Sequence, residues 1–147
     1  FRSANSFGRH AADRCRRHGL ENVRLIRSDA TFFVPYYVPD ECLQQVHIYF
    51  PDPWPKKRHH KRRLINDSFL QQLHAKLAMR GLVRVATDHA DYNNWITDHV
   101  SRLNDLFDRL PFSSPESASQ GELVGTNFER KYRRMGRSFY GLILRKR

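Results

Sequence analysis

The sequence predicts an α/β fold in which a mainly parallel sheet carries helices on both faces. Strand-like and helix-like segments alternate along the chain, and three of the short apolar strand-like segments lead to an aspartate. Strands that are joined by helices run parallel, because each helix returns the chain to the same end of the sheet. The 147 residues, 39% of them hydrophobic, suffice for one domain with a modest core.

The amino-terminal part of the chain is predicted to contain one helix and two strands. A helix is expected from Ser3 to His18, where small and apolar residues recur at three- or four-residue spacing before a glycine. A short strand is expected from Val23 to Arg27, leading to Asp29, and a second from Gln45 to Phe50, leading to Asp52. The aromatic, proline-containing stretch between these strands predicts an irregular connection.

The central part is predicted to contain two amphipathic helices on either side of a third strand. Asn66 or Asp67 is expected to cap the first helix, and Gly81 occupies its expected stop position. The stretch LVRVATD predicts a strand that ends in Asp88, and Asp91 is expected to cap the second helix. The apolar face of that second helix consists of Trp95, Ile96, Val100, Leu103 and Leu106 or Phe107.

The carboxyl-terminal part is predicted to hold a loop, a basic segment and a last strand. The polar stretch PFSSPESASQGELVG is expected to be a loop, and SFYGLILRK predicts the strand. Ligands of open α/β sheets bind at the carboxyl ends of the strands. We therefore expect Asp29, Asp52 and Asp88 to lie at one such edge.

The charge of the chain points to a polyanionic partner. Lys and Arg number 26 against 15 Asp and Glu, which gives a formal net charge of +11. Nucleic acid is the first partner to consider and an anionic membrane the second. No apolar run is long enough to span a bilayer, so no membrane insertion is expected. Cys15 and Cys42 match no metal-binding spacing, and two free thiols are typical of the reducing cytoplasm.

The stretch FPDPWP predicts a stiff loop around a single acid. Pro51, Pro53 and Pro55 each fix a backbone dihedral and restrict the residue before them. Asp52 and Trp54 are therefore held in extended geometry, which can aim the carboxylate at a ligand. The alternative is an aspartate in a proline-rich turn, with Trp54 packing on the core.

A dense basic run follows this loop directly, from Lys56 to Arg63. Such a run binds phosphates and releases their counterions. A solvated helix start and a nuclear localisation signal are the alternatives. Its two adjacent histidines have no nearby carboxylate or cysteine pattern, so we expect phosphate binding and no metal site.

A second basic group lies between Arg130 and Arg137, with Phe128 and Tyr132 interleaved. These aromatic rings can stack on RNA bases, or they can belong to the core while the arginines are exposed. No Ser-His-Asp or Cys-His arrangement can be assigned from the spacing.

The string YFPDPWPKKRHHKRR closely resembles the signature of the tRNA (guanine-N7)-methyltransferase family of the bacterial TrmB type. The resemblance continues through GLENVRLIRSDA, ATDHADYNNWI and TNFERKYRRMG, so that it covers essentially the whole chain. It implies a Rossmann-like class I methyltransferase fold that depends on S-adenosylmethionine. It also implies a cytoplasmic enzyme that transfers a methyl group to N7 of a guanosine in the variable loop of tRNA.

The resemblance also implies roles for individual residues. Asp29 matches a cofactor-binding acid, and Asp52 matches an acid at the cofactor and the reaction centre. The residues that match substrate-binding positions are Lys56, Asp88, Thr126 and Glu129. The residues that match the RNA-binding segment are Arg58, His59, His60, Lys61, Arg62 and Arg63.

One departure from the family pattern concerns the start of the chain. The amino-terminal strands and the glycine-rich cofactor turn of such enzymes are missing, which predicts that residues 1–147 form the carboxyl-terminal portion of one methyltransferase domain. A noncatalytic RNA-binding module and a methyltransferase acting on another base are the alternative functions. The sequence gives no indication of the oligomeric state.

Overall fold

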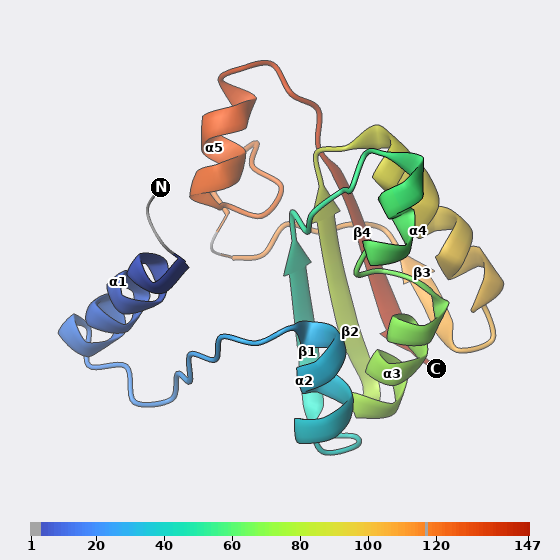
Figure 1. Cartoon of the computed structure of the whole chain (residues 1–147), viewed down its shortest axis with the longest axis horizontal. Helices are drawn as coiled ribbons and strands as arrows, with labels where there is room; N and C mark the ends of the chain where they lie inside the picture. The colour runs from blue at the N-terminus through green and yellow to red at the C-terminus, as the bar shows by residue number, and fades with distance from the viewer. Residues whose placement is uncertain (1–3, 117) are drawn as a thin grey trace.

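The structure is a computed structural model that describes residues 4–116 and 118–147 (Figure 1). The helices are α1 (Ala4–Arg17), α2 (Ala30–Tyr37), the 3₁₀ helix η1 (Lys57–Arg62), α3 (Asp67–Lys76), α4 (Ala90–Arg102) and α5 (Asn127–Arg133). The strands are β1 (Leu43–Tyr49), β2 (Leu77–Thr87), β3 (Phe107–Leu110) and β4 (Tyr140–Lys146).

The four described strands form one mixed sheet in the order β1-β2-β4-β3. Only the β1–β2 pair is parallel, whereas β4 runs antiparallel to both β2 and β3. The predicted sheet was mainly parallel. The difference arises because the connection from Leu110 to Tyr140 stays at one end of the sheet, so no helix returns the chain to the other end before β4 begins.

One face of the sheet carries the apolar core. Val83 and Val85 of β2 pair with Leu144 and Leu142 of β4, and all four are buried on the same face. They pack with apolar side chains of α3 and α4, and Val34 of α2 joins the edge of this cluster. Each such side chain that is fully buried stabilises the fold by roughly 1.5–3 kcal/mol.

The opposite face is contacted by the loop between β3 and α5 rather than by helices. The Arg84 side chain lies on this face, and a Cβ at Gly141 would lie there too. Phe112 packs against Gly141, and an Arg84 Nη1 donates to the carbonyl oxygen of Ser113 at 2.8 Å. Helices on both faces were predicted, but among the described elements α1 lies away from the sheet (Figure 1).

The predicted strand from Val23 to Arg27 is wrong, because this segment is an exposed, irregular connection. Leu25 and Ile26 are 53% and 61% exposed. A strand gains its backbone hydrogen bonds only from a neighbouring strand, and no described strand pairs with this segment.

The aromatic connection predicted after Asp29 is instead the helix α2. Asp29 caps this helix, and Pro35 lies inside it. Ala30 and Val34 pack against the core next to α3, so tertiary packing outweighs the backbone bond that the proline removes.

Two further boundaries differ from the predictions. The helix α3, capped by Asn66, ends at Lys76, and Gly81 lies inside β2 rather than in a stop position. A Cβ at Gly81 would lie 2.9 Å from the carbonyl oxygen of Ala78, so a close backbone approach explains this glycine. Phe107 was predicted as a possible end of the apolar face of the second helix. It instead begins β3 and is buried there, because α4 ends at Arg102 and the chain turns before the strand. The other predicted helices and strands are confirmed within the described residues.

We predict that Gly141→Ala destabilises the fold by about 1–3 kcal/mol. A Cβ at this position would lie 2.6 Å from the Phe112 ring, so the ring and its loop must move away from the sheet. Urea unfolding measures the effect, with Gly8→Ala in α1 as the control, because a Cβ there meets nothing within 4 Å. An unchanged unfolding midpoint for Gly141→Ala would contradict the contact.

Candidate functional site

Three acids gather where β1 and β2 end, as the sequence predicts. Asp52 follows β1, Asp88 follows β2, and Asp29 caps α2. Two adjoining cavities share Asp52 as a lining residue. The first cavity, of about 640 Å³, also contains Asp29, and the second, of about 520 Å³, also contains Asp88.

The loop that carries Asp52 has an unusual backbone. Phe50 and Trp54 have φ angles of 54° and 43°, in the left-handed region that non-glycine residues rarely adopt, so the extended geometry predicted for Trp54 is wrong. Each such residue costs roughly 1–3 kcal/mol, so the surrounding contacts must hold the loop. The Phe50 amide donates to the Ala86 carbonyl oxygen at 2.8 Å, and the Arg62 guanidinium lies 5.0 Å from the centre of the Trp54 ring.

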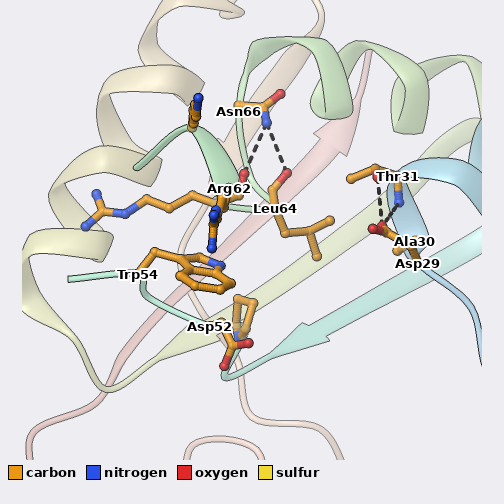
Figure 2. Close-up of a pocket in the computed structure, with 11 residues that line it drawn as sticks. Asp29, Ala30, Thr31, Asp52, Trp54, Arg62, Leu64 and Asn66 are labelled. Atoms are coloured by element: carbon orange, nitrogen blue, oxygen red, sulfur yellow. Dashed lines mark hydrogen bonds between the residues drawn. The ribbon is translucent and has the colours of Figure 1, made fainter. Parts of the chain in front are cut away.

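Asp29 combines a capping role with a position in the first cavity. One oxygen of its carboxylate accepts hydrogen bonds from the Thr31 hydroxyl at 2.7 Å and the Thr31 amide at 2.8 Å. These two bonds lower the pKa of Asp29, so the carboxylate is charged at neutral pH. Figure 2 shows Asp29 and Thr31 on one side of the cavity and Asp52 and Trp54 on the other.

The second cavity has an aromatic wall and a paired acid. Asp88 forms an ion pair with Arg137 at 2.6 Å, and the Arg137 guanidinium lies 4.0 Å from the centre of the Tyr132 ring. Phe128 stacks on Phe50 with ring centres 4.5 Å apart. Rings from the second basic group therefore line this cavity together with the strand-end acids.

Arg63 does not lie where a phosphate-binding residue should lie. Its side chain was predicted to contact RNA, but only 2% of the residue is exposed. Its Nε donates to the carbonyl oxygen of Pro53 at 2.8 Å, and its guanidinium forms an ion pair with Asp91. This prediction is corrected, because the guanidinium is used inside the protein and is closed to solvent.

The two histidines of the basic run are also partly enclosed. The His60 ring packs edge-on against Trp95, and His59 packs edge-on against Trp54. The remaining cations of the run face solvent: Lys56, Lys57, Arg58, Lys61 and Arg62. Lys61 and Arg62 line the first cavity, which places exposed positive charge beside the acids.

Thr126 and Glu129, both predicted to bind substrate, lie at the start of α5, and for Thr126 substrate binding stays a prediction. The Thr126 hydroxyl caps the helix by accepting from the Glu129 amide at 3.2 Å. Glu129 is fully buried, and its two oxygens accept from three backbone amides at 2.5 to 3.0 Å and from Arg133 at 2.8 Å. The prediction for Glu129 is corrected, since both carboxylate oxygens are already engaged.

Sequence reasoning missed several residues of this edge. His89, not Asp91, caps α4, and it lines the second cavity together with Phe50. Tyr92 and Trp95 hold the Arg63 side chain between them. Helical periodicity identified Trp95 as apolar but carried no signal for this role, because the partner is distant in sequence.

Neither a metal centre nor a membrane segment is found in the described part of the chain. No three or more His, Cys, Asp or Glu residues there form a group that could hold a metal ion. Among the described helices, none has the length and apolar character that crossing a bilayer requires.

The chain matches known proteins over nearly its whole length. A family model described as "Putative methyltransferase" matches residues 5–142. A curated tRNA (guanine-N(7)-)-methyltransferase from Alkalilimnicola ehrlichii is 40% identical over 132 residues, covering 90% of this chain and 54% of the relative. Another from Halorhodospira halophila is 39% identical, covering 88% and 55%. The chain thus spans about half the length of these curated relatives.

Solved structures with the same fold are more distant in sequence. The tRNA (m1A58) methyltransferase TrmI from Aquifex aeolicus gives a TM-score of 0.57 at 13% identity, covering 98% of this chain and 51% of that one. A SAM-dependent O-methyltransferase from Thermotoga maritima gives 0.52 at 13% identity, covering 97% and 47%. This likeness confirms the predicted Rossmann-like α/β fold.

We predict that Glu129→Gln destabilises the fold by about 1–3 kcal/mol at neutral pH, because a neutral amide cannot accept all the bonds that the carboxylate accepts. Burial alone would raise the pKa of Glu129, but hydrogen bonds from Leu123, Val124, Arg133 and Gly125 outweigh it and lower the pKa below 4.5. Stabilisation by the charged form is therefore present above pH 4.5 and is lost as the pH falls further.

Thermal unfolding at neutral pH and below pH 4.5 measures this difference, with exposed Glu21→Gln as the control. The difference in unfolding temperature between the wild type and Glu129→Gln should be smaller below pH 4.5 than at neutral pH. An equal difference at both pH values would contradict the conclusion that the charged form of Glu129 stabilises the fold.

Proposed function

This chain belongs to the methyltransferase family whose model spans residues 5–142, and on that premise we propose that the protein methylates N7 of a guanosine in the variable loop of tRNA. S-adenosylmethionine is the proposed methyl donor. The observation that carries the proposal is the position of Asp52, which lines both adjoining cavities. A group shared by two cavities can contact a methyl donor in one and a methyl acceptor in the other.

The first cavity fits S-adenosylmethionine in size and chemistry. Its volume of about 640 Å³ is in the range of small-molecule sites. Asp29 and Asp52 supply carboxylates that can accept hydrogen bonds from ribose hydroxyls and pair with the positive charge of the donor. When bound, the donor would supply a methyl group on a sulfonium sulfur.

The second cavity fits a guanine base. The rings of Phe50, Phe128 and Tyr132 offer stacking surfaces, and Asp52 and Asp88 can accept hydrogen bonds from the N1 and N2 donors of guanine. The base N7 carries a lone pair and no proton, so it attacks the methyl carbon without a general base. With both bound, the N7–C bond would form as the S–C bond of the donor breaks, and the electron pair of that S–C bond would stay on sulfur.

The protein then contributes alignment and charge. The methylated base is cationic, so carboxylates fixed beside it stabilise positive charge as it develops. The strained loop holds Asp52 in place before the substrate binds, which lowers the cost of orientation. Arg137 pairs with Asp88 and leaves Asp52 as the more exposed acid of the two.

The exposed cations of the basic run are proposed to bind the tRNA backbone. Lys56 and Lys57 begin this surface, and Arg58, Lys61 and Arg62 continue it beside the first cavity. We define these five residues as the basic surface. A cytoplasmic location is proposed as well, because the exposed Cys42 and the half-buried Cys15 are both free thiols.

We predict that Asp52→Asn lowers kcat for methyl transfer to tRNA on the order of 100-fold, because it removes the negative charge shared by both cavities. Transfer of a labelled methyl group measures the rate, and mass spectrometry of digested tRNA locates the methylated atom. Asp108→Asn is the matched control, because Asp108 of β3 pairs with Arg145 of β4 and with Arg147, and none of the three lines either cavity.

Wild-type kcat in Asp52→Asn would contradict its role. Methyl groups found on another base would favour a different methyltransferase. Binding of tRNA without any methyl transfer by the wild-type protein would favour the noncatalytic module.

We predict that Arg58→Gln with Lys61→Gln weakens tRNA binding and reduces the slope of log K against log salt by about 1–2. Each phosphate contact releases counterions, so losing contacts makes binding less sensitive to salt. Fluorescence anisotropy over a salt series measures the slope, and the double variant Arg145→Gln with Arg147→Gln, which also removes two charges, is the control outside the basic surface. An unchanged slope would show that these two side chains do not touch phosphate.

A further inference from the structure

Arg63 is a buried cation in a basic run whose other cations face solvent. Its guanidinium lies between the rings of Tyr92 and Trp95, at 5.1 Å from the centre of each. Enclosing a charge is costly unless a partner neutralises it. Asp91 is that partner, and the hydrogen bond from Arg63 lowers the pKa of Asp91 and keeps it ionised.

The contacts of Arg63 join two segments that both belong to the site. Its Nε donates to the carbonyl oxygen of Pro53, the residue next to Asp52, at 2.8 Å. Its other partner, Asp91, lies in the first turn of α4, three residues after Asp88. One side chain therefore connects the loop of one acid to the helix that follows the other.

Side chains of α4 also form hydrogen bonds with the backbone just after Arg63. The Ile65 amide donates to the Tyr92 hydroxyl at 3.1 Å, and the Trp95 indole donates to the Ile65 carbonyl oxygen at 2.7 Å. This end of the connection is thus rigidly anchored to α4. We call the set of Arg63, Asp91, Tyr92 and Trp95, together with the Pro53 carbonyl, the Arg63 clamp.

The loop at the other end of the clamp needs such an anchor. Phe50 and Trp54, on either side of Asp52, hold left-handed φ angles that would relax if the loop were free. Asp52 itself is exposed. The Arg63 bond to Pro53 is made inside this strained stretch, between Asp52 and Trp54.

We propose that Arg63 is a positioning residue that fixes Asp52 relative to Asp88 by tying the Asp52 loop to α4. The proposal rests on the proposed function of Asp52 in methyl transfer. Arg63 thus has a different role from the basic surface. Arg62 and its exposed neighbours bind phosphate, whereas Arg63 affects kcat for methyl transfer by holding Asp52 in position.

The test uses the full-length protein with Arg63→Lys, which keeps the charge but loses the forked guanidinium. We expect kcat to fall about 10- to 100-fold while the Kd for tRNA and its salt slope stay at the wild-type values. The double variant Arg63→Lys with Asp52→Asn should be no slower than Asp52→Asn alone, because both changes remove the same contribution. Arg102→Lys, in an exposed ion pair of α4 with Asp67, is the control.

A second measurement tests, without any methyl-transfer assay, whether Arg63 holds the Asp52 loop. Hydrogen exchange at the Phe50 amide, which donates to the Ala86 carbonyl oxygen at the start of the loop, should become faster in Arg63→Lys, while exchange at the β2 amides stays unchanged. If Arg63→Lys fails to fold, the double variant Arg63→Met with Asp91→Asn decides in its place, because it removes both charges of the pair and leaves neither one buried without a partner.

The outcomes separate this proposal from the proposed function. A lower salt slope with unchanged kcat would make Arg63 a phosphate ligand and overturn the proposal. Additive losses in the double variant, or unchanged exchange in the loop, would also overturn it. If the wild-type protein does not methylate tRNA, the proposed function fails, and the exchange rates alone decide whether Arg63 holds the loop.

Discussion

The parallel pairing of β1 with β2 is the constraint on which the rest of the site depends. Val46 and Ile48 pair with Val83 and Val85 and bury the same face of the sheet, so the two strands cannot shift by one residue without exposing the core. This register makes both strands end at one edge. Asp52 and Asp88 line the cavities because they follow those two ends, and α2 and α5 supply further lining residues.

The charged residues at this edge divide into those that hold the protein together and those that face a ligand. Arg63 and Glu129 are buried and hydrogen-bonded: Arg63 holds the Asp52 loop, and Glu129 holds the segment that leads into α5, the helix that supplies Phe128 and Tyr132 to the second cavity. Asp52 and the basic surface are exposed. Charged residues a few positions apart thus differ in role. A buried charge must be paired inside the protein, whereas an exposed charge is solvated and can contact a ligand.

The strained backbone of the Asp52 loop is held by contacts from other parts of the chain. The prolines restrict the backbone, and the left-handed residues on either side of the acid raise its energy. Contacts from Ala86 of β2, from Arg62 of η1 and from Arg63, which is paired with Asp91 of α4, hold this geometry. A loop held by three separate elements keeps its acid in place before any ligand arrives, which is the condition for alignment to contribute to a rate.

The sequence by itself determined the α/β class, β1, β2, β4, α3 and α4, because alternating and helical apolar patterns depend on local spacing. It also placed Asp52 and Asp88 after strands, whereas Asp29 was predicted to follow a strand and instead caps α2. Only the tertiary structure decided that α2 is a helix despite Pro35, that Phe107 begins a strand, and that residues 23–27 form no strand. It alone showed that Arg63 and Glu129 face inward, since their partners lie elsewhere in the chain or in backbone amides that spacing does not reveal.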